Sequence, residues 1–205
     1  MVVILLRAAS LAHALKINTP TIAAALNKIT TIPGRGERIE AGQDFTVVVD
    51  YAHTPDSLEA LYSAYASKKK ICVLGSTGGG RDLWKRPAMG KIADDRCDHV
   101  ILTNEDPYNE DPKSIVESIA RGMKRSPEII MDRREAIARA LALALSLSKG
   151  TQPLDAARGN QNSMAVLITG KGTDPTIQIA NGKNIPWSDA QVVHEELSKL
   201  AQRKV

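Results

Sequence analysis

Short apolar runs and amphipathic segments alternate along most of this chain, and that alternation limits the folds open to it. The runs expected to form strands lie at residues 45–50, 70–75, 99–103, 128–131, 165–169 and 176–179. Segments with helical spacing follow, with starts expected at Thr54, Pro87, Asp111, Asp132 and Ser188. Because the connections are short, the pattern predicts a Rossmann-like α/β fold: a doubly wound, mostly parallel sheet with helices on both faces.

Four of the predicted strands end in residues suited to ligand binding. In doubly wound folds, ligands lie at the carboxyl ends of the strands. We therefore expect a functional site in the loops after Asp50, Gly75, Thr103 and Thr169.

Composition narrows the class of ligand. Hydrophobic residues make up 43% of the 205, which is typical of a globular protein, while aromatic residues make up only 3%. So few aromatic rings argue against the base-stacking surfaces of single-stranded nucleic-acid binders. The net charge of +4 suits a phosphorylated small molecule better than a polyanion, so no nucleic-acid partner is expected.

The thiol and imidazole groups predict neither a disulfide framework nor a metal site. Cys72 and Cys97 are expected to be reduced thiols in a cytoplasmic protein. The four histidines show no metal-ligand spacing. The apolar run at the start of the chain stops at Arg7, too early for a signal sequence or a membrane span, so no membrane association is expected.

The first part of the chain does not follow the alternating pattern. Residues 8–16 predict one short helix, and Thr19 is expected to cap a second. Two helices of this size cannot bury their apolar faces alone. We interpret residues 1–31 as the end of a longer unit that precedes a domain at 32–205.

Residues 148–162 also differ from the rest of the chain. They are polar, rich in Gly, Gln and Asn, and without periodicity. This composition predicts an exposed, mobile loop or insertion.

A glycine-rich loop follows the second predicted strand. Residues 75–82 read Gly-Ser-Thr-Gly-Gly-Gly-Arg-Asp, with the G-x4-G spacing of a phosphate-binding loop. Arg81 and Asp82 stand where such a loop has Lys and Ser or Thr, so a true Walker loop is not expected. The glycines are compatible with close backbone approach to a ligand or with a structural turn.

Charged residues near other strands allow both a functional and a structural interpretation. Asp50 could accept hydrogen bonds from ribose hydroxyls or cap the following helix. Arg35 and Arg38 could clamp a phosphate or be solvated. The four carboxylates within residues 103–112 could bind a cationic amino group or cap a helix.

Taken together and in this order, these segments resemble the C-terminal domain of the Mur ligases. The resemblance spans about residues 32 to 195 and rests on Pro33-Gly-Arg-Gly-Glu-Arg38, Asp50-Tyr-Ala-His-Thr-Pro-Asp56, Gly80-Arg-Asp, Lys85-Arg-Pro87, Asp106-Pro107, Asp132-Arg-Arg-Glu-Ala136 and Gly170-Lys-Gly172. The branch that it resembles most adds the third amino acid to UDP-MurNAc-dipeptide. Residues 1–31 look like the closing helices of that family's central ATPase domain.

The resemblance implies ATP-driven amide formation through an acyl phosphate, with ATP and Mg²⁺ as cofactors. It implies UDP-MurNAc-dipeptide, a free amino acid and the N-terminal and central domains of the ligase as partners. Arg35 would contact the transferred phosphate, and Asp50, Tyr51 and His53 would bind the nucleotide. The residues that would bind the incoming amino acid are Arg81, Asp82, Asp106, Tyr108, Gly170 and Asp174.

The sequence departs from the family in three places. The phosphate loop, magnesium ligands and modified lysine of the central domain have no counterpart, so the chain is expected to hold no metal and to be inactive alone. The family's Asp-Asn-Pro-Arg, whose Arg selects meso-diaminopimelate, reads Glu105-Asp-Pro-Tyr108. The family's Gly-Lys-Gly-His-Glu reads Gly170-Lys-Gly-Thr-Asp174.

The second departure bears on the choice of amino acid. Tyr108 cannot make a bidentate pair with a distal carboxylate, and acidic residues surround it in the sequence. We therefore expect an amino acid without a second carboxylate, such as lysine or ornithine, to be preferred over meso-diaminopimelate.

Two other functions remain open. The chain could be a free-standing module that binds a nucleotide or an amino acid without catalysis. It could also belong to the folylpolyglutamate or cyanophycin synthetase branch, although Asp50-Tyr-Ala-His-Thr-Pro-Asp56 with Gly-Lys-Gly fits the cell-wall branch better. An in-frame Gly-Thr-x-Gly-Lys-Thr region encoded upstream of Met1 would distinguish a truncated ligase from a binding module.

Overall fold

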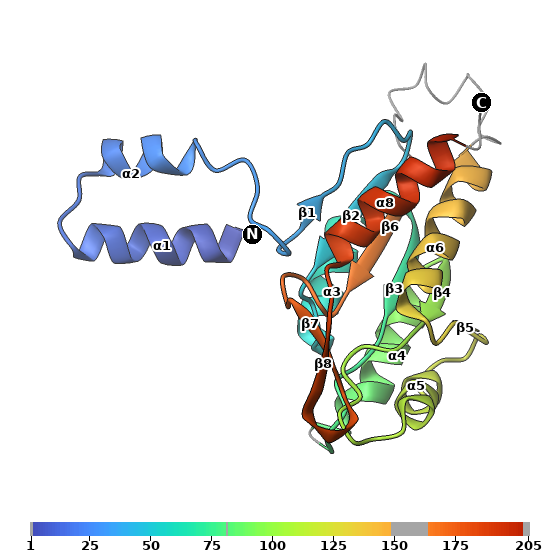
Figure 1. The fold of residues 1–205 in the computed structure, drawn as a ribbon. Helices are drawn as coiled ribbons and strands as arrows, with labels where there is room; N and C mark the ends of the chain where they lie inside the picture. The colour runs from blue at the N-terminus through green and yellow to red at the C-terminus, as the bar shows by residue number, and fades with distance from the viewer. Residues whose placement is uncertain (1, 81, 149–163, 203–205) are drawn as a thin grey trace.

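A six-stranded sheet forms the centre of the protein (Figure 1). The computed structural model describes residues 2–80, 82–148 and 164–202, so the loop predicted at 148–162 lies, except for Ser148, outside the described residues. In sheet order the strands are β1 (Glu37–Arg38), β2 (Thr46–Asp50), β6 (Met164–Thr169), β3 (Lys69–Leu74), β4 (His99–Leu102) and β5 (Glu128–Ile129). β1 pairs antiparallel with β2, and every other pairing is parallel. The predicted mostly parallel sheet is confirmed.

Helices cover both faces of this sheet (Figure 1). One face carries α6 (Arg133–Ser148) and α8 (Asp189–Gln202), and the other carries α3 (Pro55–Ala64), α4 (Lys85–Arg96) and α5 (Pro112–Ala120). In β2, Val47 and Val49 belong to the apolar cluster of the first face, while Val48 belongs to that of the second. This follows because successive side chains of a strand point to opposite faces. The doubly wound architecture is confirmed.

Capping residues fix where most helices begin. A side-chain oxygen in each cap accepts a backbone N–H from the first turn, and the caps are Thr54, Asp111, Asp132 and Ser188. These are the caps that the sequence predicted. α4 differs, because it begins at Lys85 rather than Pro87 and has no side-chain cap.

Helices α1 (Val2–Ala14) and α2 (Thr19–Leu26) lie beside the sheet domain (Figure 1). Their segment leaves apolar side chains exposed, among them Leu6 at 61%, Leu11 at 64% and Leu15 at 67%. Thr19 is not the N-cap of α2, because the Asn18 side chain accepts the hydrogen bond from the first turn and Thr19 already lies in the helix. No helix in the described parts of the chain is long and apolar enough to cross a membrane.

A separate hairpin lies against the loop that follows β4. It consists of β7 (Thr176–Ile179) and β8 (Lys183–Pro186). Gln178 accepts a hydrogen bond from the backbone N–H of Tyr108 and donates its own N–H to Asp106. The sequence predicted β7 but neither β8 nor β1, because β1 has two charged residues and β8 has a single apolar side chain besides its proline, so neither shows an apolar pattern.

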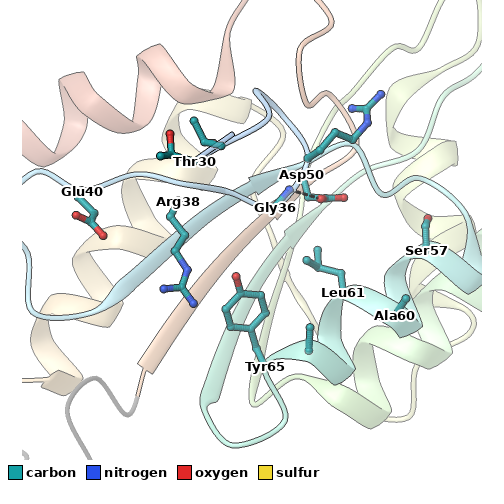
Figure 2. Close-up of a pocket in the computed structure, with 12 residues that line it drawn as sticks. Thr30, Gly36, Arg38, Glu40, Asp50, Ser57, Ala60, Leu61 and Tyr65 are labelled. Atoms are coloured by element: carbon teal, nitrogen blue, oxygen red, sulfur yellow. Dashed lines mark hydrogen bonds between the residues drawn. The ribbon is translucent and has the colours of Figure 1, made fainter. Parts of the chain in front are cut away.

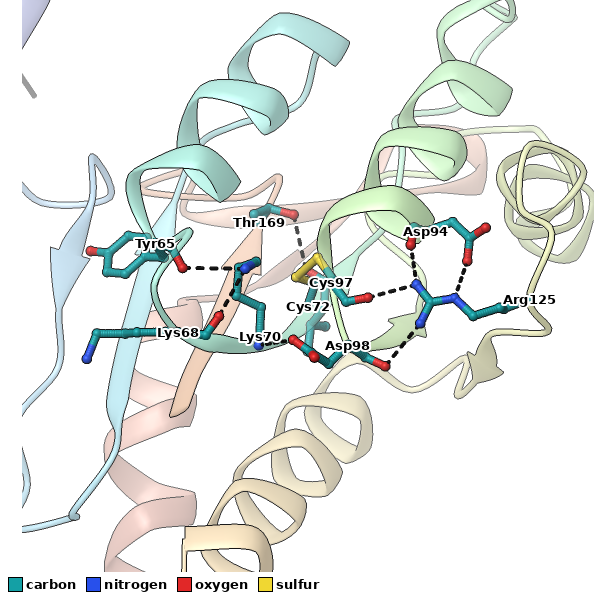
Figure 3. The surroundings of a disulfide bond; sticks show 10 residues. Tyr65, Lys68, Lys70, Cys72, Asp94, Cys97, Asp98, Arg125 and Thr169 are labelled. Carbon is teal, nitrogen blue, oxygen red and sulfur yellow. Dashed lines mark hydrogen bonds and ion pairs between the residues drawn. A yellow bond between two sulfur atoms is a disulfide. The ribbon is translucent and has the colours of Figure 1, made fainter. Parts of the chain in front are cut away.

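Cys72 and Cys97 form a disulfide, so the prediction of two reduced thiols is wrong (Figure 3). Cys72 lies in β3, and Cys97 is the residue after the last turn of α4. Because α4 packs on the sheet beside β3, the two Cα atoms lie 6.2 Å apart. The prediction relied on the number of cysteines, whereas the pairing depends on this packing. The ring that the bond closes contains the whole glycine-rich loop.

We expect reduction of the disulfide to lower the free energy of unfolding by about 3.5 kcal/mol, because a bond that spans 25 residues restricts the unfolded chain. Urea unfolding with and without reductant measures the difference. The double variant Cys72→Ala/Cys97→Ala is the control, since reductant should not change its unfolding. An oxidised wild type no more stable than the reduced one would contradict the prediction.

Candidate functional site

The four strand ends expected to carry a site are neighbours in the structure. β2, β6, β3 and β4 are adjacent and parallel, so their carboxyl ends meet at one edge. Two hydrogen bonds join them there: Gly170 donates its N–H to the carbonyl of Asp50 at 3.2 Å, and Thr103 donates to that of Leu74 at 3.0 Å. The four loops that were expected to carry the site therefore form one continuous surface at this edge of the sheet.

A cavity of about 260 Å³ opens where these ends meet, and we call it the strand-end cleft. Predicted site residues that line it are Tyr51, His53, Asp82, Asp106, Tyr108, Gly170 and Asp174. Thr77, Gly78, Lys85 and Glu105 complete the lining. Sequence reasoning did not select Lys85 or Glu105 as site residues. Lys85 lies in a segment that carries the family resemblance, whereas Glu105 was considered only as one of the four carboxylates of the acidic loop. Arg81 lies outside the described residues.

A larger cavity, of about 820 Å³, lies between α3 and the segment that leads into β1 (Figure 2). We call it the α3 cavity. Arg35, Arg38 and Asp50 line it opposite the apolar surface of α3, which includes Leu61, and Tyr65 lies at its far end. The residues expected to bind the nucleotide are thus divided: Asp50 lies here with Arg35, whereas Tyr51 and His53 lie in the strand-end cleft.

Three side chains connect the two cavities. The guanidinium carbon of Arg35 lies 4.3 Å from the centroid of the Tyr51 ring, where the negative face of the ring attracts it. The His53 ring meets Tyr51 edge to face, with ring centroids 4.7 Å apart. Nδ1 of His53 lies 2.8 Å from the carbonyl oxygen of Tyr51, which orients the imidazole. Arg35 is therefore held at the border of the strand-end cleft.

Asp50 ties the Arg35 turn to the end of β2. Its Oδ2 accepts the N–H of Gly36 at 2.5 Å (Figure 2). Its Oδ1 accepts the N–H of Ala52 at 2.7 Å. It does not cap α3, because Thr54 does so. A carboxylate oxygen has two lone pairs, so each oxygen of Asp50 can still accept a further donor.

Glycines allow the turns of the site to touch. Gly34 has φ +60° and Gly172 has φ +50°, which non-glycine residues rarely adopt. A Cβ on Gly172 would lie 2.7 Å from Cβ of Tyr51, and a Cβ on Gly34 would lie 2.5 Å from the backbone nitrogen of Thr173. No side chain fits at either position, so the Arg35 turn, Tyr51 and the Gly172 turn pack as one unit.

Lys171 pairs with two carboxylates of the strand-end cleft. Its side chain is 1% exposed, and its Nζ lies 2.8 and 2.7 Å from the two carboxylate oxygens of Asp106 and 2.9 Å from Oδ2 of Asp174. The single ammonium offsets only one of these two negative charges, so Asp106, Asp174 and Lys171 together keep one net negative charge at the cleft. The Gly-Lys-Gly motif held the signal for Lys171, which sequence reasoning did not select.

The acidic loop after β4 does not present four free carboxylates. Asp106 is paired, and Asp111 caps α5. Glu110 receives two hydrogen bonds from Arg86 at 2.6 and 2.8 Å, and these hold the pKa of its carboxyl below the usual range. The expected preference against a second carboxylate assumed repulsion from this loop, and the structure removes most of that repulsion.

Glu105 is the remaining carboxyl of that loop. It is 2% exposed, its Oε1 accepts the hydroxyl of Thr77 at 3.0 Å, and no described group bonds to its Oε2. Burial raises its pKa, although the positive charge of Arg133 opposes the shift. The Glu105 carboxyl therefore favours its neutral form more than an exposed glutamate does.

We expect Glu105 to reduce stability as pH rises from the ordinary glutamate pKa of 4.5 towards its raised folded pKa. In that interval the unfolded chain releases the proton and the folded chain retains it, so ionisation favours unfolding. Relative to wild type, Glu105→Gln should therefore gain stability with increasing pH. Urea unfolding at several pH values measures this, with exposed Glu135→Gln as control. A difference that does not change with pH would contradict it.

The structure is a doubly wound α/β domain with two cavities by the carboxyl ends of its strands, the place where folds of this class bind ligands. The family model described as Mur ligase, glutamate ligase domain, matches residues 34–172. The chain therefore belongs to the Mur ligase family, as its motifs indicated.

Similar proteins support this assignment. A UDP-N-acetylmuramoyl-L-alanyl-D-glutamate--2,6-diaminopimelate ligase of Caldanaerobacter subterraneus subsp. tengcongensis is 37% identical over 200 residues, covering 95% of this chain and 38% of that protein. A solved structure of a ligase with the same name has a TM-score of 0.66 and 28% identity, covering 95% of this chain and 37% of the other. A Mycobacterium tuberculosis folylpolyglutamate synthase complexed with ADP shares the fold, with TM-score 0.53 and 19% identity over 90% of this chain and 35% of its own. The chain thus spans little more than a third of these relatives.

Proposed function

We propose that this chain is the C-terminal, amino-acid- and nucleotide-binding part of an ATP-dependent ligase of peptidoglycan precursors. The whole ligase adds the third amino acid to UDP-MurNAc-dipeptide. Relatives that carry this activity in their names cover 95% of the chain, which supports the proposal.

The contact between Arg35 and Tyr51 is the observation that carries the proposal. A reaction through an acyl phosphate needs the phosphate and the attacking amine side by side. Arg35 lines the α3 cavity and can bind the phosphate, while Tyr51 lines the strand-end cleft, which suits the amino acid. The 4.3 Å contact therefore supports a phosphate-binding residue next to the cleft that binds the amino acid.

The residues of this chain then have separate tasks. Arg35 neutralises the phosphate of the acyl phosphate, and the strand-end cleft orients the amino acid. The amine attacks the acyl carbon, the bond from that carbon to the phosphate oxygen breaks, phosphate leaves with the electron pair, and the proton that the nitrogen loses passes to the departing phosphate. The positive charge of Arg35 stabilises the leaving phosphate.

The described residues fit only one part of the nucleotide site. Arg35 and Arg38 supply positive charge, and Asp50 retains acceptor capacity for a ribose hydroxyl. Among the residues that the structure describes, no three His, Cys, Asp or Glu side chains are grouped to hold a metal ion, and the sequence contains no G-x4-GK[ST]. We assign the Mg²⁺ ligands and the grip on the β- and γ-phosphates to another part of the ligase. When bound, Mg²⁺ neutralises phosphate charge there.

We assign residues 1–31 to the end of the central ATPase domain and residues 32–205 to the C-terminal domain. The family match begins at residue 34, which supports this boundary. The exposed apolar side chains of α1, such as Leu6 and Leu11, would then pack against the rest of the central domain.

We expect the chain alone to release no phosphate from ATP, because it lacks a phosphate loop. A phosphate-release assay with ATP and Mg²⁺ measures this. Activity that Arg35→Ala abolishes, and that Arg121→Ala at the exposed end of α5 leaves intact, would show that the chemistry does not need another domain.

A chimera tests the proposed function directly. Residues 32–205 replace the matching part of the Caldanaerobacter ligase, and phosphate release should depend on both UDP-MurNAc-dipeptide and an amino acid. Arg35→Ala should lower the rate about a hundredfold, since one group that stabilises developing charge is lost. Arg121→Ala is the control. A folded chimera that binds both ligands but never releases phosphate would favour the binding module without catalysis.

A further inference from the structure

Lys85 lines the strand-end cleft, and no carboxylate of the described residues lies within ion-pair distance of its ammonium. The residue is 8% exposed and lines the cleft beside Thr77 and Gly78. Within the described parts of the chain, nothing forms a hydrogen bond or an ion pair with its Nζ.

The other buried lysines show how unusual this is. Lys171 contacts the carboxylates of Asp106 and Asp174. Lys70 donates to the backbone carbonyls of Tyr65 and Lys68 (Figure 3). A charge that is largely removed from water raises the free energy of the protein unless it is bonded. An ammonium that faces a ligand cleft without a partner is therefore suited to bind an anionic group of the ligand.

The backbone reinforces the positive charge at this point. Lys85 is the first residue of α4, whose twelve residues place the positive end of the helix dipole there. The residue at the N-cap, Trp84, makes no side-chain capping hydrogen bond. The backbone N–H of Lys85 donates to the carbonyl of Asp82, which fixes the start of the helix at the edge of the cleft.

Among the described residues, which do not include Arg81, two other cations near the cleft are engaged or face elsewhere. Arg86 donates to both carboxylate oxygens of Glu110 and to the carbonyl of Thr77. Lys113 is 76% exposed on α5, within 3.9 Å of Glu117, and does not line the cleft. Neither can replace Lys85 as a partner for an anion in the cleft.

The surroundings of Lys85 also favour the carboxylate of an amino acid as the anion that it binds. At about 260 Å³ the cleft is less than a third of the α3 cavity, too small for a nucleotide. Lys171 offsets only one of the two charges of Asp106 and Asp174, Asp82 adds a further carboxylate, and the buried Glu105 carboxyl is biased towards its neutral form. A second carboxylate entering the cleft therefore depends on Lys85 for its counter-charge.

We propose that Lys85 binds the side-chain carboxylate of the incoming amino acid and so selects an amino acid with two carboxylates, a contact that neutral Tyr108 cannot supply. This inference rests on the proposed function. It reverses the preference expected from the acidic loop, and 2,6-diaminopimelate, named in the relatives' activity, has the required second carboxylate.

Two matched amino acids test this on the chain itself. meso-2,6-Diaminopimelate and lysine differ only in the side-chain carboxylate, and calorimetric or NMR titration measures their affinities. Wild type should bind diaminopimelate more tightly than lysine. Lys85→Met should weaken diaminopimelate binding about ten- to a hundredfold, the loss of one charge-assisted bond, and change lysine binding less than about twofold. Lys85→Arg should retain most of the preference.

Lys113→Met is the matched control, since it removes an exposed lysine outside the cleft and should change neither affinity. Unchanged diaminopimelate binding in Lys85→Met, or equal losses for both amino acids, would overturn the proposal. If Lys85→Met does not fold, NMR of the wild type with ¹³C-methylated lysines tests the proposal instead. The Lys85 signal should move with diaminopimelate but not with lysine. If neither amino acid binds wild type, the proposed function itself fails, and the role of Lys85 with it.

Discussion

The buried ion pair between Arg133 and Asp189 fixes the edge of the sheet on which both cavities depend. The side chains are 1% and 0% exposed, and the guanidinium donates to both carboxylate oxygens at 2.8 and 2.7 Å and to the carbonyl of Thr169 at 2.8 Å. The indole of Trp187 donates to the same carboxylate. Because Arg133 begins α6 and Asp189 begins α8, the pair joins two helices to the end of β6. Buried charges need such complete bonding, so this arrangement restricts how the strand ends can pack.

The fold class was predictable because it depends on local patterns, and the fold in turn brings the four strand ends together. The alternation of Val47, Val48 and Val49 between the two faces is a property of any strand, and a cap such as Asp111 acts within its own turn. The residues expected to bind the nucleotide were not predicted to line two different cavities. Consecutive residues at the end of a strand point in different directions. Asp50 turns towards the α3 cavity and Tyr51 towards the strand-end cleft.

Charges in the site depend on contacts between residues far apart in the chain. Asp106 and Lys171 are separated by 65 positions, and Arg86 and Glu110 by 24. No local pattern shows which carboxylates such partners neutralise, so the acidic loop looked more available in the sequence than it is. Within the described part of the chain, Oε2 of Glu105 and the ammonium of Lys85 are among the groups of the cleft that have no partner.

The disulfide has a further consequence for the loop that it encloses. Its exposed residues, where a protease would cut most readily, include Gly79, Gly80, Leu83 and Trp84. All lie between Cys72 and Cys97, so a single cut there leaves both pieces covalently joined. A nicked molecule would migrate as intact protein on a non-reducing gel and separate into two fragments only after the thiols are freed. Its β3 and α4 would remain attached to each other, and the wall of the cleft would survive the cut.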